Sequence, residues 1–310
     1  MISFQGVSKR YGKVWALRDV TFQLPKGQVL GLLGENGAGK TTAMNILTGC
    51  LAPSAGRVTV GGWDVMMEPR QAKRRIGYLP EQAPLYDEMT VESYLRFACR
   101  LKEVESAAIP GHIRQVMERT GLQKAADRRI GNLSKGYRQR VGMAQALCGT
   151  PDALILDEPT AGLDPLQSSE MRALIRALSG EHTVLVSSHI LSEMQQICDR
   201  VIILHQGRIV CDRMLRGDRA KRPPLRAVIA CGEGALLPEL KKMKTVSDVQ
   251  VERGSDAGTT RAVLTPREDG DAERELFQLL SRQGWPLLRL SAVEDDLEDT
   301  FLRCVMGREE

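Results

Sequence analysis

A nine-residue segment near the N-terminus has the composition of a phosphate-binding loop. It consists of Gly34, Glu35, Asn36, Gly37, Ala38, Gly39, Lys40, Thr41 and Thr42. An apolar run over 28–33 precedes it and a helical pattern over 40–47 follows it, which is the context that makes this pattern meaningful. Glycines let the backbone N–H groups wrap around phosphate oxygens, and the helix N-terminus adds positive dipole. Lys40 is then expected to hold the β- and γ-phosphates of a nucleotide, and the Thr41 hydroxyl to ligate Mg²⁺.

Two carboxylates stand at the end of a second buried strand. The apolar run 153–156 is followed directly by Asp157 and Glu158. Ligands of open α/β sheets bind at the carboxyl ends of the strands. Asp157 is therefore expected to hold Mg²⁺ directly or through water, and Glu158 to polarise an attacking water as general base. The acidic pair is weak evidence alone, but with the glycine-rich loop it indicates hydrolysis of a nucleoside triphosphate.

The elements that must position these residues alternate between strand and helix. A further apolar run at 183–187 precedes another helical pattern. Such alternation predicts an α/β fold with a mainly parallel sheet between helices. Apolar residues at helical spacing over 91–101 and 112–122 have no strand between them, so we expect an inserted helical subdomain over about 83–150.

A second domain is predicted after the basic, proline-containing stretch 213–226. We interpret 216–224 as a linker, because two adjacent prolines cannot continue a helix. Beyond it, 225–310 is expected to form a small α+β accessory domain. Strands are predicted at 225–230, 246–251, 260–264 and 286–290, and helices at 235–243 and 271–283. The resulting order, βαββαβ, is typical of a ferredoxin-like split unit. A last helix is predicted over 294–305.

Composition excludes several other classes of protein. The net charge of +4 over 310 residues does not suggest nucleic acid as a partner. No apolar run reaches the roughly 20 residues that span a bilayer, and residues 1–10 lack the apolar core of a signal peptide. We therefore expect a cytoplasmic protein, with any membrane role exerted through a partner.

The seven cysteines are Cys50, Cys99, Cys148, Cys198, Cys211, Cys231 and Cys304. Their number is odd, they are scattered, and none forms a CxxC pair. This pattern argues against a disulfide framework or a zinc site, and favours reduced, buried thiols.

The stretch 133–140, which reads LSKGYRQR, resembles the signature motif of the ATP-binding cassette (ABC) family. Ser134 is placed to cap a helix, and its hydroxyl and the Gly136 N–H offer donors to a phosphate. The resemblance implies that these donors meet the γ-phosphate held by the opposite subunit. It therefore implies ATP and Mg²⁺ as cofactors and a second cassette as partner, with a homodimer as the simplest arrangement.

Other positions match further elements of this family. Tyr11 resembles the aromatic residue that stacks on adenine, and Asp164 lies in a stretch that resembles the loop crossing between subunits. His189, after the strand at 183–187, resembles the histidine that contacts the γ-phosphate. The resemblance covers residues 1–215 and implies the P-loop fold of an ABC nucleotide-binding domain.

The sequence departs from the family's pattern in three places. Lys135 and Tyr137 replace the first glycine and the final glutamine of the signature. The polar residue usual before Leu163 is missing, because Gly162 stands there. Glu81 follows Pro80, where glutamine is usual, and Gln82 comes next. The residue that senses Mg²⁺ and the γ-phosphate could be either, and position favours Glu81.

The sequences of several stretches resemble one branch of this family, the ATPase subunits of bacterial ABC-2 type exporters. They are 77–81 (GYLPE), the signature, and 297–302 (LEDTFL) near the C-terminus. This resemblance implies an integral membrane permease as partner, which inserts a short helix between the glutamine loop and the helical subdomain. It places the chain on the inner face of the cell membrane. The alternatives are an importer ATPase subunit and a soluble ABC ATPase acting on ribosomes or DNA.

Overall fold

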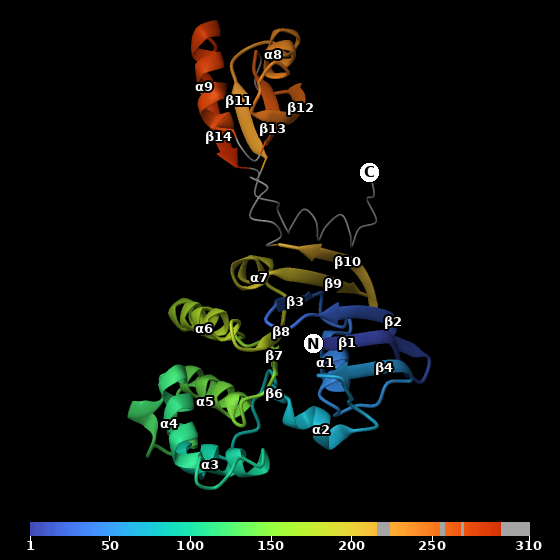
Figure 1. The fold of residues 1–310 in the computed structure, drawn as a ribbon, viewed down its shortest axis with the longest axis vertical. Coiled ribbons are helices and arrows are strands. Elements are labelled where there is room, and N and C mark those ends of the chain that lie inside the picture. Colours follow the sequence, from blue (N-terminus) through green and yellow to red (C-terminus); the bar gives the residue numbers. More distant parts are fainter. Residues whose placement is uncertain (216–223, 255–257, 268–269, 293–310) are drawn as a thin grey trace. The chain divides into compact units, whose positions relative to one another are not determined.

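A computed structural model describes residues 1–215, 224–254, 258–267 and 270–292 (Figure 1). They divide into two units, Met1–Leu215 and a second within Arg216–Thr300. Each unit has its own hydrophobic core. The helix predicted over 294–305 and most of the predicted linker lie outside the described residues.

The first unit contains a six-stranded sheet that is parallel except at one edge. Its strand order is β10-β9-β3-β8-β7-β6, and β10 runs antiparallel to β9. The strands are β3 (Val29–Leu33), β6 (Ile76–Leu79), β7 (Ala153–Asp157), β8 (Thr183–Ser188), β9 (Arg200–His205) and β10 (Arg208–Met214). Every residue of β3, β7 and β8 is buried, as continuous apolar runs require in a covered parallel sheet. The predicted parallel sheet is confirmed.

A second sheet of the first unit is antiparallel and is absent from the sequence-based description. Its order is β2-β1-β4-β5. The strands are β1 (Ile2–Tyr11), β2 (Val14–Leu24), β4 (Ala55–Val60) and β5 (Trp63–Asp64). Phe4 and Phe22 stack across β1 and β2 with ring centroids 4.5 Å apart. Irregularities shift the β1–β2 register several times, which interrupts the alternation by which such strands are recognised.

The helices of the first unit outside the helical subdomain are α1 (Lys40–Leu47), α2 (Pro69–Arg74), α6 (Pro165–Leu178) and α7 (Leu191–Ile197). The bounds of α1 agree with the predicted 40–47. Its apolar side, with Met44, Ile46 and Leu47 fully buried, belongs to the core that also takes residues from both sheets. The core therefore fixes the first turn of α1 against the end of β3.

The chain between β6 and β7 forms the helical subdomain (Figure 1). It consists of α3 (Val91–Leu101), α4 (Ile109–Thr120), the short turns η1 (Gln123–Ala125) and η2 (Ile130–Asn132), and α5 (Lys135–Leu147). The bounds of α3 agree with prediction, and Thr90 caps it by accepting from the Ser93 N–H. α4 begins before the predicted His112, because Pro110 is accommodated in its first turn.

The second unit has the element order β11-α8-β12-β13-α9-β14. Its elements are β11 (Leu225–Ile229), α8 (Glu233–Leu240), β12 (Val246–Arg253), β13 (Thr260–Pro266), α9 (Ala272–Gln283) and β14 (Leu287–Ala292). The sheet order is β12-β13-β11-β14, with antiparallel neighbours throughout. This order of elements and strands is that of the predicted ferredoxin-like split unit.

Within the part of the chain that the structure describes, every helix is too short or too polar to span a lipid bilayer.

Candidate active site

The loop between β3 and α1 is packed too closely for side chains at two of its glycines. A Cβ on Gly34 would lie 2.5 Å from the Leu204 carbonyl oxygen, and one on Gly39 would lie 2.5 Å from the Ala16 carbonyl oxygen. Gly39 also has a φ of 110°, which other residues rarely adopt. It stands at the N-cap of α1, where no side chain caps the helix. The first-turn N–H groups are therefore left for an anion.

Lys40 lies inside this loop. The residue is 7 % exposed, and its ammonium donates to the carbonyl oxygens of Gly34 at 2.6 Å and Glu35 at 3.3 Å. These partners are neutral dipoles, so the positive charge of Lys40 is not neutralised by them. A buried ammonium beside a helix N-terminus, with only backbone carbonyls as its hydrogen-bond acceptors, is an attractive site for phosphate oxygens.

Asp157 ends β7 at the carboxyl edge of the parallel sheet. It is 3 % exposed and accepts a hydrogen bond of 2.6 Å from the Ser187 hydroxyl. Burial raises the pKa of Asp157, and the nearby charges of Glu158 and Glu81 act in the same direction, while the Ser187 hydroxyl and Lys40 oppose them. A carboxylate that is costly to ionise because of burial and like charge is suited to a divalent cation.

Glu158 is held in a strained conformation next to His189. Its φ is +47°, uncommon for a residue with a side chain. Its N–H donates to the Ser187 hydroxyl at 3.0 Å, and its carboxylate lies 3.0 Å from His189 Nδ1. The Glu158 side chain is 12 % exposed and that of His189 is 56 % exposed. The pair thus combines a shielded base with a partner that reaches solvent, as proton transfer from water requires.

These groups meet around one small cleft of about 170 Å³ at the edge of the sheet. Its lining consists of Ala16, Glu35, Asn36, Gly37, Gly39, Lys40, Thr41, Thr42, Glu81, Asp157 and Glu158. The structure thus brings together the phosphate loop and the acidic pair, which the sequence places more than a hundred residues apart. Gly34 and Ala38 belong to the loop but lie outside the lining. Among the described residues, Glu81 lines this cleft and Gln82 does not.

Tyr11, Ser134, Gly136, Asp164 and His189 lie outside the cleft lining. Tyr11 ends β1 and is 51 % exposed, with the Lys9 ammonium 5.2 Å from its ring centroid. An exposed ring at a strand end is available for stacking on a base. Its role therefore stays a prediction.

The signature residues occupy the N-terminus of α5. Ser134 is the N-cap, and its hydroxyl accepts from the Tyr137 N–H at 3.5 Å. Gly136 is buried, and a Cβ there would collide with the Gln167 side chain at the start of α6. The first turns of α5 and α6 therefore lie close together, and the Ser134 hydroxyl lies on an exposed surface.

The loop after Glu158 is tied to both helices. Gln139 of α5 is buried and donates to the Pro159 carbonyl oxygen at 3.0 Å. Asp164 caps α6 by accepting from the Gln167 N–H at 2.8 Å. Movement of α5 would therefore displace the backbone that follows Glu158.

Two supporting residues, Ser187 and Gln139, are not predicted by the sequence patterns. Ser187 contacts both Asp157 and the Glu158 backbone, and Gln139 connects the signature helix to the loop after Glu158. For Ser187 a signal was available, because a hydroxyl ends an apolar strand at the sheet edge where ligands bind. For Gln139 no such signal was available, because a glutamine within a polar helical stretch is ordinary.

A larger groove lies beside the helical subdomain and has a volume of about 580 Å³. Its walls include Tyr94, Phe97 and Leu101 of α3, Pro80 and Pro84, and the basic residues Arg70, Lys73 and Arg74 of α2. The Lys102 ammonium donates to the carbonyl oxygens of Lys73 at 2.8 Å and Ile76 at 2.5 Å. Burial lowers the pKa of Lys102. This side chain holds the end of α3 against α2 and β6.

Comparisons with known proteins identify the family of this chain. The family described as "ABC transporter" matches residues 17–161. The chain is 41 % identical over 216 residues to the ABC transporter ATP-binding protein NatA of Bacillus subtilis, which covers 68 % of this chain and 88 % of NatA. It is 30 % identical over 309 residues to the bacitracin transport ATP-binding protein BcrA of Bacillus licheniformis, which covers 99 % of this chain and 98 % of BcrA.

A solved structure shares the fold of the first unit. The dimeric structure of MJ0796, a bacterial ABC transporter cassette, superposes with a TM-score of 0.64 at 25 % identity. The match covers 70 % of this chain and all of that one. The phosphate loop, the acidic strand end and these relatives lead to one conclusion: the chain belongs to the ATP-binding proteins of ABC transporters and is an ATPase of that family.

Proposed function

We propose that the chain is the ATP-hydrolysing motor subunit of a bacterial exporter of the ABC-2 type. The supporting observation is that Lys40, Asp157 and Glu158 meet at one cleft. The relatives are named for transport, which favours this function over one on ribosomes or DNA. Export, rather than import, rests on the resemblance of 77–81 and the signature to the exporter branch.

The cleft suits a nucleotide bound together with Mg²⁺. Its lining carries four carboxylates, from Glu35, Glu81, Asp157 and Glu158, against the single ammonium of Lys40. Thr41, Asp157 and Glu81 are the side chains that would hold the cation. Bound Mg²⁺ supplies positive charge that offsets the charge developing on phosphoryl oxygens.

The residues of the chain have separate tasks in hydrolysis. Lys40 and the first turn of α1 hold the terminal phosphates, because both present positive charge inside the loop. Glu158 accepts a proton from the attacking water, and its position is set by the Ser187 hydroxyl on its N–H and by His189 on its carboxylate. His189 orients that carboxylate, and its side chain, 56 % exposed, is available to contact the γ-phosphate of bound ATP.

Half of the phosphate-binding donors are supplied by a second cassette. Ser134 and Gly136 lie outside the lining of the cleft that contains Lys40, and the Ser134 hydroxyl lies on an exposed surface. An identical second copy is the simplest partner, and the related MJ0796 cassette has a dimeric structure. Asp164, at the exposed start of α6, belongs to the same surface.

The groove beside the helical subdomain receives a short helix of an integral membrane permease. An apolar wall of Tyr94, Phe97 and Leu101 faces basic residues of α2, which suits an amphipathic helix. The permease then places this chain on the inner face of the cell membrane. Nucleic acid is not expected as a partner, given the net charge of +4.

Hydrolysis is tested with Lys40→Ala, compared with Lys26→Ala at an exposed lysine outside the cleft. Loss of the charge on the transferred phosphate should lower phosphate release at least about 100-fold. The Lys26 variant should hydrolyse ATP at the unsubstituted rate. Turnover near that rate in Lys40→Ala would contradict the assignment of this loop as the nucleotide site.

The permease contact is tested with Leu101→Glu, which puts a charge into the groove where Leu101 is 68 % exposed. Leu288→Glu, at an exposed leucine of the second unit, is the matched control. We expect the Leu101 variant to keep basal ATP hydrolysis but to lose retention on membranes of the source cell. Equal retention of both variants would exclude the groove as the permease site.

A further inference from the structure

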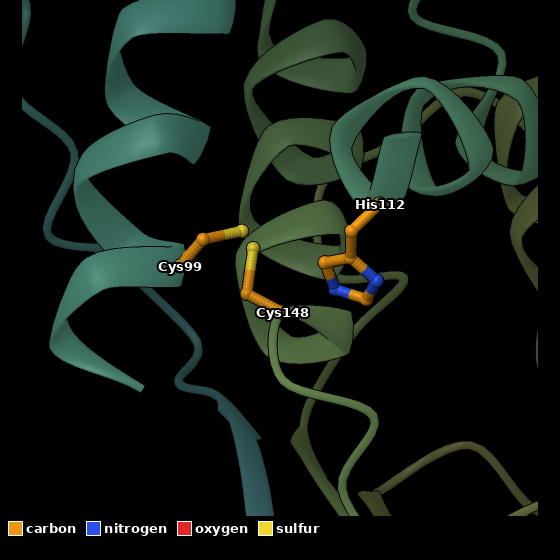
Figure 2. Close-up of side chains that lie close together, drawn as sticks. All are labelled: Cys99, His112 and Cys148. Atoms are coloured by element: carbon orange, nitrogen blue, oxygen red, sulfur yellow. The ribbon is translucent and has the colours of Figure 1, made fainter. Parts of the chain in front are cut away.

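Three side chains with metal-binding chemistry meet inside the helical subdomain, away from the nucleotide cleft. They are Cys99 of α3, His112 of α4, and Cys148, which directly follows α5 (Figure 2). The two sulfur atoms and an imidazole nitrogen all lie within 4.8 Å of one another. Figure 2 shows the two sulfur atoms next to each other and the imidazole ring of His112 beside Cys148.

The cluster is enclosed by protein, so these groups are not solvated surface residues. Cys99 is 0 % and Cys148 1 % exposed, and the two thiols are hydrogen-bonded neighbours. The Cys148 thiol also lies 3.4 Å from the Ala144 carbonyl oxygen. Buried thiols that have each other and a backbone carbonyl as partners are weakly satisfied, since sulfur forms poor hydrogen bonds.

The hydrogen bond of His112 determines which ring nitrogen carries a lone pair. The Gly149 N–H donates to His112 Nε2 at 3.1 Å, so Nε2 is the unprotonated nitrogen of a neutral ring. A neutral imidazole with a fixed tautomer is the form that ligates metals. The donor belongs to the residue next to Cys148, so the lone pair is directed at the turn that carries the second thiol.

The dimensions suit a small thiophilic cation. Zinc binds thiolate sulfur at about 2.3 Å and imidazole nitrogen at about 2.0–2.1 Å, with tetrahedral geometry. Ligand atoms of such a centre are then about 3.5–3.8 Å apart. The ligand atoms of the three residues lie within 4.8 Å of one another, so their largest separation has to shrink by only about 1 Å. We propose that Cys99, His112 and Cys148 bind one zinc ion, with water as the fourth ligand.

A cleft next to His112 offers an entry path for the ion and its fourth ligand. It has a volume of about 460 Å³, and His112, Leu147 and His182 are in its lining. His182 is 6 % exposed, and its Nδ1 lies 2.6 Å from the Pro151 carbonyl oxygen. Its Nε2 is buried without a hydrogen-bond partner among the described residues.

The two positive charges of the zinc ion are balanced by the release of two protons from its ligands. The Cys99 and Cys148 thiols each release one proton to solvent, and His112 Nε2 exchanges its hydrogen bond from Gly149 for a bond to zinc. The ion then connects α3 and α4 to the C-terminal end of α5. Since α5 begins at the signature residues Ser134 and Gly136, the site stabilises the helix that contacts nucleotide across the proposed dimer.

Cobalt(II) and zinc added to the metal-free, reduced full-length protein test the proposal. Nucleotide is omitted and excess Mg²⁺ is present, because Mg²⁺ prefers the oxygen ligands of the cleft. One cobalt per chain should bind with a thiolate-to-metal absorption band, and one equivalent of zinc should abolish it. Zinc should also raise the midpoint of thermal unfolding by several degrees.

Substitutions assign the binding to these residues. Cys99→Ser and His112→Gln should weaken zinc binding at least about 100-fold, more than loss of an outer-sphere partner usually does. Glutamine at 112 keeps an acceptor for the Gly149 N–H, so this variant is expected to fold. Cys50→Ser and Cys231→Ser, at thiols outside the cluster, should bind zinc as the unsubstituted chain does.

Two results would overturn the site. One is cobalt binding without a thiolate band. The other is zinc affinity and thermal shift in His112→Gln equal to those of the unsubstituted chain.

Discussion

The ammonium of Lys135 occupies the space into which a Cβ at Gly162 would project. Lys135 replaces the first glycine of the family's signature, and Gly162 stands where a polar residue is usual. These two departures from the family's pattern, at Lys135 and Gly162, are therefore in contact. Gly162 has a φ of +66° and leaves room for the lysine, which crosses from the start of α5 to the loop before α6.

This contact predicts coupling between the two positions. Gly162→Ala should destabilise the first unit by about 1–2 kcal/mol, because alanine is strained at positive φ. It should also displace the Lys135 ammonium. In a Lys135→Ala background the same change should cost less by about 0.5 kcal/mol or more. Urea unfolding of the unsubstituted protein, the two single variants and the double variant gives the four free energies of unfolding that are needed. An equal cost of Gly162→Ala in both backgrounds would disprove the coupling.

Glu158→Gln should trap a dimer. Glutamine keeps the size of the side chain but cannot accept a proton from water, so hydrolysis should nearly stop while ATP stays bound. Bound ATP then bridges Lys40 of one chain to Ser134 of the other, and Mg-ATP should convert monomer to dimer in sedimentation experiments. Adding Ser134→Arg should abolish the dimer without preventing binding at Lys40. A monomer at saturating Mg-ATP would argue against a symmetric homodimer.

Tyr11→Ala should weaken ATP binding by about 1–3 kcal/mol, the usual contribution of stacking between a base and an aromatic ring. Preference among ATP, GTP and CTP should change less than affinity, because every base has a stacking face. Trp15→Ala, at another partly exposed aromatic residue, is the comparison variant. Titration of each protein with a fluorescent ATP analogue gives the dissociation constants. An unchanged constant in Tyr11→Ala would reduce Tyr11 to a packing role.

Asp157→Asn should stabilise the nucleotide-free fold at neutral pH while it abolishes most ATPase activity. Burial raises the pKa of Asp157 above the ordinary 3.8, so the folded state binds this proton more tightly than the unfolded chain does. The ionised Asp157 carboxylate therefore lowers the stability of the fold. This loss of stability is absent below the ordinary pKa, grows as pH rises through the raised pKa, and is complete above it. Asparagine removes the charge, and its carbonyl can still accept from Ser187.

The thermal midpoint of Asp157→Asn should therefore exceed that of the unsubstituted protein by a few degrees at pH 8. The difference should shrink as the pH is lowered toward about 4. Asp127→Asn, at an exposed carboxylate, should show no such pattern. A midpoint of Asp157→Asn that is lower at pH 8 would mean that Asp157 contributes to stability as a charged group.

A chain ended at Gly217 should fold and bind ATP, because the two units have separate cores. The core of the second unit consists of residues from Leu225 onward, and includes Leu236, Leu264 and Leu276. Circular dichroism and ATP titration check this. We expect that any defect of the truncated chain will appear in partner binding or in regulation. A truncated protein that is insoluble or unable to bind ATP would place the domain boundary elsewhere.

The sequence by itself determined the parts of this protein that are contiguous in the chain. The phosphate loop, Asp157 and Glu158 at a strand end, the bounds of α1 and α3 and the βαββαβ order were all predicted. Each rests on local physics: backbone freedom at glycine, the period of apolar residues, and the strand ends at which ligands bind. The antiparallel sheet was missed because its bulged strands lack a regular alternation.

Only the tertiary structure decided which distant segments touch. It placed Glu81, rather than Gln82, in the cleft lining with Asp157, and it brought Lys135 to Gly162. It also brought Cys99, His112 and Cys148 together, although their spacing along the chain had argued against a zinc site. Contacts of this kind depend on how helices and loops pack against one another, and the order of residues along the chain does not encode them locally.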